Sequence, residues 1–254
     1  METILIANQK GGIGKTTTAT AIANVLQKKG YKVLFIDADP QGNSTDTYRA
    51  NTGDGVTTLY DVILEKENPV NINDAIQHTE FGDIVASDKL LSGADKVLNG
   101  DVDGFFMLRE AIADLNGYDF SIIDTGPSLN TLLINCLVAA DKIVIPITAD
   151  KYGIQGLSQL YDSINKTKKR FNPNLKISGL LLVQYDIRTI LARDVKKALK
   201  EIAEQIDTKV FKTYIRKCVK VPEAQTSREL LINYAPKCTS SKDYIELVDE
   251  ILEE

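Results

Sequence analysis

Short, continuously apolar runs alternate along this chain with longer segments whose apolar residues recur at the spacing of a helix. The runs at 33–36 and 142–146 lack alternation of apolar and polar residues, which is typical of parallel strands covered on both faces. We expect strands at 3–7, 32–36, 118–123, 142–147, 177–183 and 209–215. We expect helices at 18–28, 103–115, 130–140, 154–171, 192–206 and 242–252.

This pattern predicts an α/β fold, a doubly wound, mostly parallel sheet with helices on both faces and right-handed crossovers. No internal repeat, low-complexity segment or linker interrupts it, so we expect residues 1–254 to form a single domain. The segment 42–100 is less regular, and we expect small helices there over the edge of the sheet.

A glycine-rich segment connects the first expected strand to the first expected helix, which is the context that a phosphate-binding loop requires. Its glycines allow backbone N–H groups to surround a polyphosphate, and the start of the helix adds partial positive charge. We expect Lys15 to reach the β- and γ-phosphates of a nucleotide and the Thr16 hydroxyl to bind Mg²⁺. The expected nucleotide-binding residues are Gly11, Gly12, Ile13, Gly14, Lys15, Thr16 and Thr17.

Two acidic segments follow expected strands, at the edge of the sheet where open α/β folds bind ligands. Asp37 and Asp39 follow the second strand, and Asp124 follows the strand at 118–123. A magnesium–polyphosphate site needs a carboxylate near the metal and a group that orients the attacking water. We expect Asp124 and Asp37 to support Mg²⁺ through water, and Asp39 to position the attacking water. An aspartate after a strand also commonly caps a helix or turn, so the assignment depends on both sites following a phosphate loop.

The charge of the chain is unevenly distributed. The formal net charge is -5, so the whole molecule is not a basic nucleic-acid binder. Between residues 166 and 220, however, fifteen Lys and Arg stand against five Asp and Glu. A local basic surface on an acidic protein indicates a polyanionic partner that is bound through its phosphates. An ordinary solvated helix surface has the same composition, and charge alone leaves both interpretations open.

Composition also restricts the compartment and the metal chemistry. The 254 residues, 43% of them hydrophobic, suit one large α/β domain. The three cysteines, Cys136, Cys218 and Cys238, are scattered, which argues against a disulfide framework and for a reducing cytoplasm. No apolar run approaches membrane-spanning length and the first strand begins near Met1, so we expect neither a membrane span nor a signal peptide. With one histidine, His78, and no C-x-x-C, a structural zinc site is not expected.

The glycine-rich loop departs from the standard phosphate-loop pattern, because Gln9 stands where that pattern has its first glycine and Lys10 follows it. This departure resembles the deviant loop K-G-G-x-G-K-[ST] of the ParA/MinD/nitrogenase-iron-protein group. Nearly the full chain resembles the ParA family of partition ATPases, and within it the small, chromosomal Soj-type members. The resemblance depends on the segments 8–17, 37–43, 124–129, 144–146, 156–160 and 186–189.

The resemblance implies a homodimer that encloses ATP, binds DNA nonspecifically and hydrolyses ATP when a ParB-type centromere-binding protein stimulates it. In this group the early lysine reaches the nucleotide of the partner subunit, and Lys10 matches its position. Lys10, Lys15 and Asp39 are therefore the expected catalytic residues. Arg188 and Lys217 fall where Soj-type members place DNA-contacting residues, with Lys220 close by. Such a protein would act in the cytoplasm, on the nucleoid, in chromosome or plasmid partition.

Three departures from the family are visible in the sequence. Gly126 replaces the proline usual in D-x-P-P-S, so we expect a looser segment after Asp124. The loop that usually borders the adenine, 215–225 here, follows I-P-R-x-x-x-x-S-E-A-P only in part, which leaves the base contacts open. Larger plasmid relatives carry an N-terminal winged-helix domain that binds an operator, and we expect none in this chain.

Other functional classes remain as alternatives. A MinD-like ATPase docks on membranes through a basic amphipathic helix, whereas residues 243–254 are amphipathic but acidic, so no membrane partner is expected. A cluster-carrying relative, such as the nitrogenase iron protein, needs paired cysteines at a dimer axis, whereas Cys136 is alone in an apolar helix. An ATPase that positions a protein cargo would carry the same motifs, and the sequence leaves that alternative open.

Overall fold

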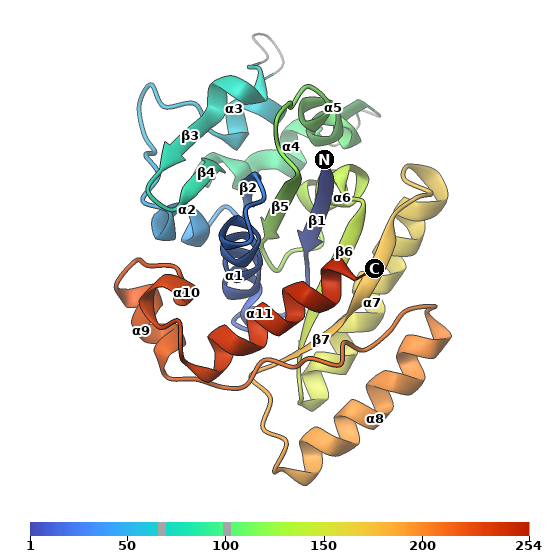
Figure 1. Cartoon of the computed structure of the whole chain (residues 1–254). Helices are drawn as coiled ribbons and strands as arrows, with labels where there is room; N and C mark the ends of the chain where they lie inside the picture. The colour runs from blue at the N-terminus through green and yellow to red at the C-terminus, as the bar shows by residue number, and fades with distance from the viewer. Residues whose placement is uncertain (66–69, 99–102, 254) are drawn as a thin grey trace.

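The apolar runs form the strands of one sheet in the computed structural model of the chain (Figure 1). The structure describes residues 1–65, 70–98 and 103–253. Within them the sheet has seven strands in the order β3-β4-β2-β5-β1-β6-β7. Every neighbouring pair is parallel except β3 with β4, which confirms the predicted, mostly parallel α/β sheet. The strands are β1 (Glu2–Ile6), β2 (Val33–Ala38), β3 (Ile76–Thr79), β4 (Gly82–Val85), β5 (Phe120–Thr125), β6 (Lys142–Thr148) and β7 (Lys176–Val183).

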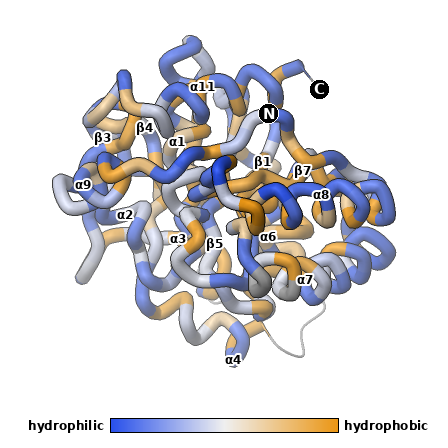
Figure 2. The backbone as a smooth tube through the Cα atoms, turned by 90° about the horizontal axis from the view of Figure 1, so that it is seen from below, coloured by the Kyte–Doolittle hydropathy of each residue, from blue (hydrophilic) through white to orange (hydrophobic). Residues whose placement is uncertain are grey.

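Helices cover both faces of this sheet, because its central strands are apolar on both sides. In β1, Ile4 and Ile6 belong to one core with α1 and α11, whereas Leu5 belongs to a second core with α3 to α8. Figure 2 shows these two groups of helices on opposite sides of the strands. The helices are α1 (Lys15–Lys28), α2 (Asn43–Thr47), α3 (Leu59–Ile63), α4 (Ala94–Leu98), α5 (Met107–Ala113), α6 (Thr131–Ala139), α7 (Lys151–Arg170), α8 (Ile190–Gln205), α9 (Lys220–Thr226), α10 (Leu231–Tyr234) and α11 (Thr239–Leu252).

Five of the six expected strands are confirmed, and they correspond to β1, β2, β5, β6 and β7. The sixth, at 209–215, is wrong. This segment runs beside β7 and forms only isolated bridges, at Val210 and Arg216. The backbone N–H groups of Lys212 and Thr213 donate to the carboxylate of Glu250 on α11, at 2.9 and 3.1 Å. The Glu250 side chain therefore accepts backbone hydrogen bonds that a β-strand would donate to a neighbouring strand.

The irregular segment 42–100 contains the short helices that we expected, α2, α3 and α4 among its described residues. It also contains the hairpin β3–β4, which the sequence analysis missed. β3 is an edge strand of four residues, Ile76 to Thr79, and none of them is fully buried. Such a strand lacks the long apolar run that marks the central strands, so its sequence signal is weak.

Gly179 in β7 allows the ring of Phe211 to lie directly on the sheet. A β-carbon at position 179 would stand 2.7 Å from Cε2 of Phe211, inside the core. We expect Gly179→Ala to lower the free energy of unfolding by about 1–3 kcal/mol, because the buried ring has to move. Thermal unfolding measures this effect. Gly93→Ala is the control, since a β-carbon there would meet nothing within 4 Å; equal melting temperatures for the two variants would contradict the prediction.

Candidate functional site

The glycine-rich loop connects the end of β1 to the start of α1. Gly12 and Gly14 have φ angles of 71° and 91°, in the left-handed region that favours glycine. β-Carbons built at Gly11, Gly12 or Gly14 would meet nothing within 4 Å, so the loop faces open space. The first N–H groups of a helix have no partners within the helix, and at α1 they lie beside this space. The loop and the helix start can therefore bind an anion.

Lys15 lies at the start of α1 with 7% of its surface exposed. Its Nζ donates to the backbone carbonyl of Lys10 at 3.1 Å. Burial lowers the pKa of Lys15, and the carboxylates of Asp124 and Asp39 oppose this effect. A half-desolvated ammonium group at the base of the loop is arranged to bind a negative ligand.

Lys10 is bound to residues of its own chain. Its Nζ forms an ion pair with Asp150 at 2.6 Å and donates to the Thr148 hydroxyl at 3.0 Å. Thr148 is the last residue of β6, and Asp150 lies in the turn between β6 and α7. Asn8 supports this arrangement, because it accepts from the Lys10 backbone N–H and donates to the carbonyl of Pro146.

The two acidic segments lie side by side because β2 and β5 are neighbours, with Asp37 in register with Asp124. Asp37 is fully buried, and its Oδ2 accepts from the backbone and the hydroxyl of Thr45, each at 2.7 Å. Its Oδ1 accepts from the backbone N–H of Asp39 at 3.1 Å. Burial, and then the charge of Asp124, raise the pKa of Asp37. Asp37 is thus a buried support of the site whose two oxygens already have donors.

Asp124 differs from Asp37 in having an oxygen without a partner. Its Oδ2 accepts from the Ser44 hydroxyl at 2.7 Å, whereas the buried Oδ1 has no hydrogen-bond partner among the described residues. Burial raises the pKa of Asp124, and hydrogen bonds from Ser44 and Thr16 lower it in part. A buried carboxylate oxygen with a hydroxyl group nearby is a suitable ligand environment for a hard cation.

Asp39 lies at the end of β2, with 7% of its surface exposed. Its Oδ1 accepts from the backbone N–H of Gln41 at 3.0 Å. A β-carbon on Gly126 would stand 3.0 Å from this same oxygen. The glycine that replaces the family's proline therefore leaves room for the Asp39 carboxylate.

Sequence analysis missed several residues that support the site. Ser44 and Thr45 bind the two buried carboxylates, and Ser87 donates to the carbonyl of Asp39 at 2.6 Å. Gln184 donates to the carbonyl of Gly12, and Gln225 donates to the Thr17 hydroxyl. These common polar residues form no motif. Gln225 belongs to the segment 215–225 that was expected near an adenine, but its contact with the distant Thr17 has no local signal in the sequence.

A cavity of about 690 Å³ lies beside the glycine-rich loop. The loop, Asp39 and the segment 215–225 line it, so the structure brings the segment expected near an adenine to the same cavity as the loop. Such a volume suits a nucleotide-sized ligand. No group of three His, Cys, Asp or Glu in the described residues could hold a metal ion. Mg²⁺ commonly takes one or two carboxylates together with phosphates and waters, and Asp124 with Thr16 fits that role.

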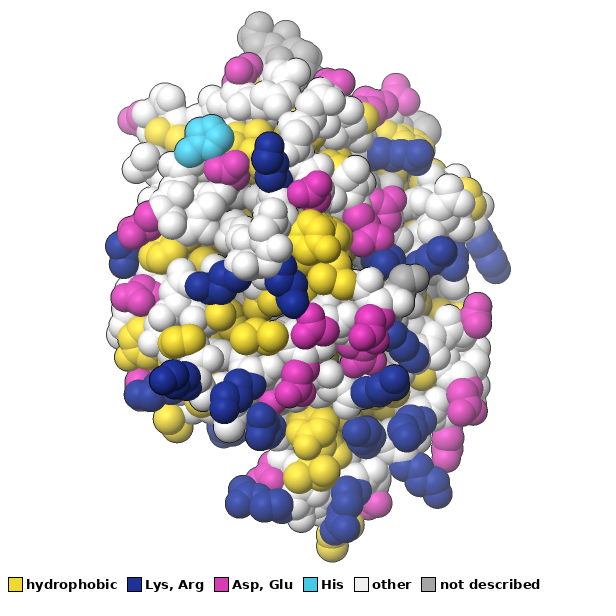
Figure 3. All heavy atoms as spheres, viewed as in Figure 1, with side chains coloured by type: hydrophobic (Ala, Val, Ile, Leu, Met, Phe, Trp, Pro, Cys, Tyr) yellow, Lys and Arg dark blue, Asp and Glu magenta, His cyan; other side chains and the backbone are white. Residues whose placement is uncertain are grey.

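The three residues expected to contact DNA lie near one end of the sheet. A bridge between Tyr185 and Arg216 places the turn at 186–189 beside the segment 216–220. Arg188 is exposed and pairs with Asp186 at 2.7 Å, and Lys220 pairs with Glu223 at 2.7 Å. Exposed ion pairs of this kind contribute little to stability, so phosphate groups can displace the acidic partners of Arg188 and Lys220. Figure 3 shows Lys and Arg side chains gathered over the lower half of the view, where α8 lies.

The acidic helix at the end of the chain is part of the core. Tyr244, Leu247, Val248 and Ile251 of α11 are buried in the core that also contains α1. The apolar face of this helix is therefore already covered, which argues against membrane docking through it. No helix in the described part of the chain is long and apolar enough to cross a membrane.

Known proteins resemble the chain over almost its whole length. A family profile described as "AAA domain" matches residues 1–177. "Chromosome partitioning protein ParA" of Caulobacter vibrioides is 36% identical over 257 residues, which cover 99% of this chain and 94% of that protein. "Sporulation initiation inhibitor protein Soj" of Bacillus subtilis is 35% identical over 249 residues, covering 98% of this chain and 97% of that protein.

A solved structure shows the same similarity in three dimensions. It is a cobyrinic acid a,c-diamide synthase from Mycobacterium smegmatis with a bound ATP analogue and magnesium. The two structures superpose with a TM-score of 0.84 at 29% sequence identity, over 100% of this chain and 95% of that chain.

Proposed function

The chain belongs to the ParA/Soj family of partition ATPases, and on this premise we propose that it hydrolyses ATP slowly with Mg²⁺ to segregate DNA. The proposal depends mainly on one observation: the glycine-rich loop, Lys15 and Asp39 line a single cavity of nucleotide size, and the buried carboxylate of Asp124 lies close to Lys15. We further propose that residues 1–254 act as one ATPase domain in the cytoplasm, on the nucleoid.

Different residues at the cavity bind the phosphates, support Mg²⁺ and orient the attacking water. The backbone of Gly11 to Thr17 surrounds the phosphates, and Lys15 binds the β- and γ-phosphates with its buried charge. Thr16 and Asp124 would hold Mg²⁺, the latter through water, and Asp37 on the neighbouring strand would support the same site through water. When bound, Mg²⁺ neutralises charge that develops on the phosphates. Asp39 orients the attacking water, because it lies at the cavity with one carboxylate oxygen fixed by Gln41.

ATP is proposed to bring two subunits together across the loop. Lys10 would then contact the nucleotide of the partner subunit, which requires its ion pair with Asp150 to break. The Lys10–Asp150 pair is partly exposed, with side-chain exposures of 31% and 36%, so breaking it costs little free energy. Asp150 thereby keeps Lys10 in place until the partner arrives.

We expect Gly11→Val to prevent the ATP-dependent dimer, and calorimetric titration with ATP separates this effect from a loss of nucleotide binding, because Gly11 lines the cavity. Gly11 has no left-handed φ and open space around it, so a branched side chain fits the loop but obstructs a second subunit. Gly12 is less suitable for this test, since its φ of 71° would strain any substitution. Sedimentation of the variant in an Asp39→Ala background with ATP is the measurement. A normal dimer would refute the proposed interface.

The dimer is proposed to bind DNA through Arg188, Lys217 and Lys220, without sequence preference. We expect Arg188→Glu to abolish DNA binding and to leave ATP binding unchanged, because the substitution repels phosphates at a site outside the cavity. Arg109→Glu on α5 is the control for the same change of charge elsewhere, and it should bind DNA like the unaltered protein. Normal DNA affinity in Arg188→Glu would exclude that residue from the interface.

The proposed function is tested by titrating DNA of arbitrary sequence with and without ATP at two salt concentrations. Binding should require ATP and weaken steeply with salt, as expected for phosphate contacts. Adding a ParB-type protein should accelerate hydrolysis. Equal binding in both nucleotide states, or none for the trapped dimer at low salt, would favour an ATPase that positions a protein cargo.

A further inference from the structure

Three large apolar side chains lie on the surface where β7 leads into α8. Ile187, Ile190 and Leu191 are each more than half exposed, and Ile190 reaches 70%. We call these three residues the apolar tip. Figure 1 shows the start of α8 protruding at the bottom of the view. Apolar side chains scattered singly need no explanation, whereas a group of them at one place marks an interaction site. None of the roles proposed above uses this group.

The backbone beneath the apolar tip is held in place by side chains. The Thr189 hydroxyl accepts from the backbone N–H of Ala192 at 3.2 Å, as the cap of α8. The hydroxyl of the buried Tyr185 donates to the carbonyl of Ala192, also at 3.2 Å. Further along α8, Val195 and Leu199 are buried in the core. The tip is therefore a fixed projection at the first turn and not the apolar face of a whole helix.

Basic side chains surround the apolar tip. Within the segment 186–193, Arg188 and Arg193 are exposed. The segment 216–220 lies alongside and contains another exposed apolar residue, Val219, between two lysines. These two segments together contain five Lys and Arg against one Asp. An apolar group inside a basic surface favours a partner that offers apolar surface between negative charges.

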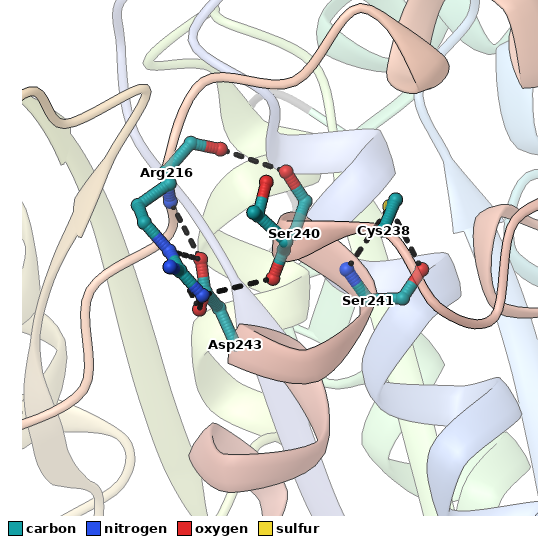
Figure 4. Close-up of polar contacts among 6 residues, drawn as sticks. Arg216, Cys238, Ser240, Ser241 and Asp243 are labelled. Carbon is teal, nitrogen blue, oxygen red and sulfur yellow. Dashed lines mark hydrogen bonds and ion pairs between the residues drawn. The ribbon is translucent and has the colours of Figure 1, made fainter.

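The segment 216–220 is anchored to α11. Arg216 forms an ion pair with the buried Asp243, and its backbone carbonyl accepts from the Ser240 hydroxyl at 2.7 Å. Figure 4 shows these contacts, which join the segment to the start of α11. The basic residues and the apolar tip are therefore held in one arrangement, so little ordering is needed when a partner binds.

We propose that the apolar tip is a wedge that enters between two base pairs of DNA and bends the double helix, while the surrounding arginines and lysines bind the phosphates. This inference rests on the proposed function, because it assumes that the dimer binds DNA through this surface. DNA presents stacked, apolar base faces between two rows of phosphates. Proteins that insert Ile or Leu between base steps partly unstack the bases and bend the duplex by about 20–90°.

Two other partners fit the apolar tip less well. A stable protein interface buries about 800 Å² on each partner, whereas the tip is three side chains interrupted by Arg188 and Thr189. A helix that docks on a membrane lies along it with an extended apolar face, whereas Val195 and Leu199 of α8 are buried in the core. A narrow projection among basic residues suits the narrow gap between two base pairs.

The test compares the full chain with the double variant Ile190→Ser/Leu191→Ser, both in an Asp39→Ala background with ATP. Energy transfer between dyes at the two ends of a short DNA duplex measures bending. The intact tip should bring the ends closer, whereas the double variant should leave the duplex straight and bind it at least about tenfold more weakly. Leu252→Ser, an exposed leucine at the far end of α11, is the matched control and should bend DNA normally. Equal bending by the double variant would overturn the proposal.

Salt dependence separates the wedge from the phosphate contacts. An apolar contact releases no counterions, so the double variant should bind more weakly at every salt concentration with an unchanged slope of log affinity against log salt. Arg188→Glu should instead reduce that slope. A mismatched base pair, which unstacks easily, should raise the affinity of the intact tip by about tenfold and that of the double variant less. A changed slope in the double variant, or equal gains from the mismatch, would contradict the wedge.

Two further measurements decide between the wedge and the other partners. If the double variant sediments as a monomer with ATP, the apolar tip belongs to the subunit interface and the proposal is wrong. Binding to phosphatidylglycerol vesicles that is lost in the double variant would assign the tip to a membrane and overturn the proposal as well. DNA binding without bending by the intact tip would refute the wedge alone, whereas no DNA binding by the trapped dimer at low salt would refute the wedge and the proposed function together.

Discussion

Lys15→Ala is expected to abolish ATP binding, with a loss of affinity of at least about 100-fold. The ammonium group of Lys15 is largely desolvated before any ligand arrives, so it is the main buried counter-charge for the phosphates. Removing one partner of a buried, hydrogen-bonded charge pair usually costs about 2–5 kcal/mol. Calorimetric titration with ATP and Mg²⁺ measures the loss directly.

The control for this variant is Lys28→Ala, which removes an exposed lysine from the last turn of the same helix. It should bind ATP like the unaltered protein. Without nucleotide, Lys15→Ala should melt at or above the temperature of the unaltered protein, because burial disfavours the charged lysine that the substitution removes. Unchanged ATP affinity in Lys15→Ala would refute the role given to Lys15. A large loss of stability would show that the loss of ATP affinity comes from unfolding of the variant.

Asp39→Ala is expected to bind ATP and to form the dimer, but to hydrolyse ATP about 10²–10⁴ times more slowly. The carboxylate lies at the cavity and not within the phosphate loop, so its removal affects the attacking water and leaves the phosphate contacts in place. Single-turnover hydrolysis and sedimentation with ATP measure the two effects. Asp46→Ala, which removes an exposed carboxylate that lines the same cavity and pairs with Arg228, is the control. Wild-type turnover in Asp39→Ala would exclude this residue as the water-positioning group.

The centre of the fold and of the candidate site could be predicted because both depend on local patterns. Buried parallel strands are continuous apolar runs, and ligands bind where such strands end, so the loop and the two acidic segments were placed together before the structure was known. The hydroxyl groups of Ser44 and Thr45 could not be predicted, because serine and threonine are common everywhere and their partners come from other strands.

The wrong strand at 209–215 has a physical cause, which is that a side chain distant in sequence decides local structure. Glu250 on α11 binds the backbone at 212–213 and prevents a sixth predicted strand. Counting charges identified a basic region, but it did not show that Arg188 and Lys220 form ion pairs with acidic residues two and three positions away.

The close approach of Gly126 to Asp39 has a consequence for how this site can evolve. Any side chain at position 126 would bring a β-carbon to 3.0 Å from Oδ1 of Asp39, the oxygen that accepts from Gln41. A lineage that restored the family's proline would therefore first have to accommodate a shifted carboxylate. The same proline would be harmless on one background and damaging on another, so the order in which substitutions arise would determine which of them survive.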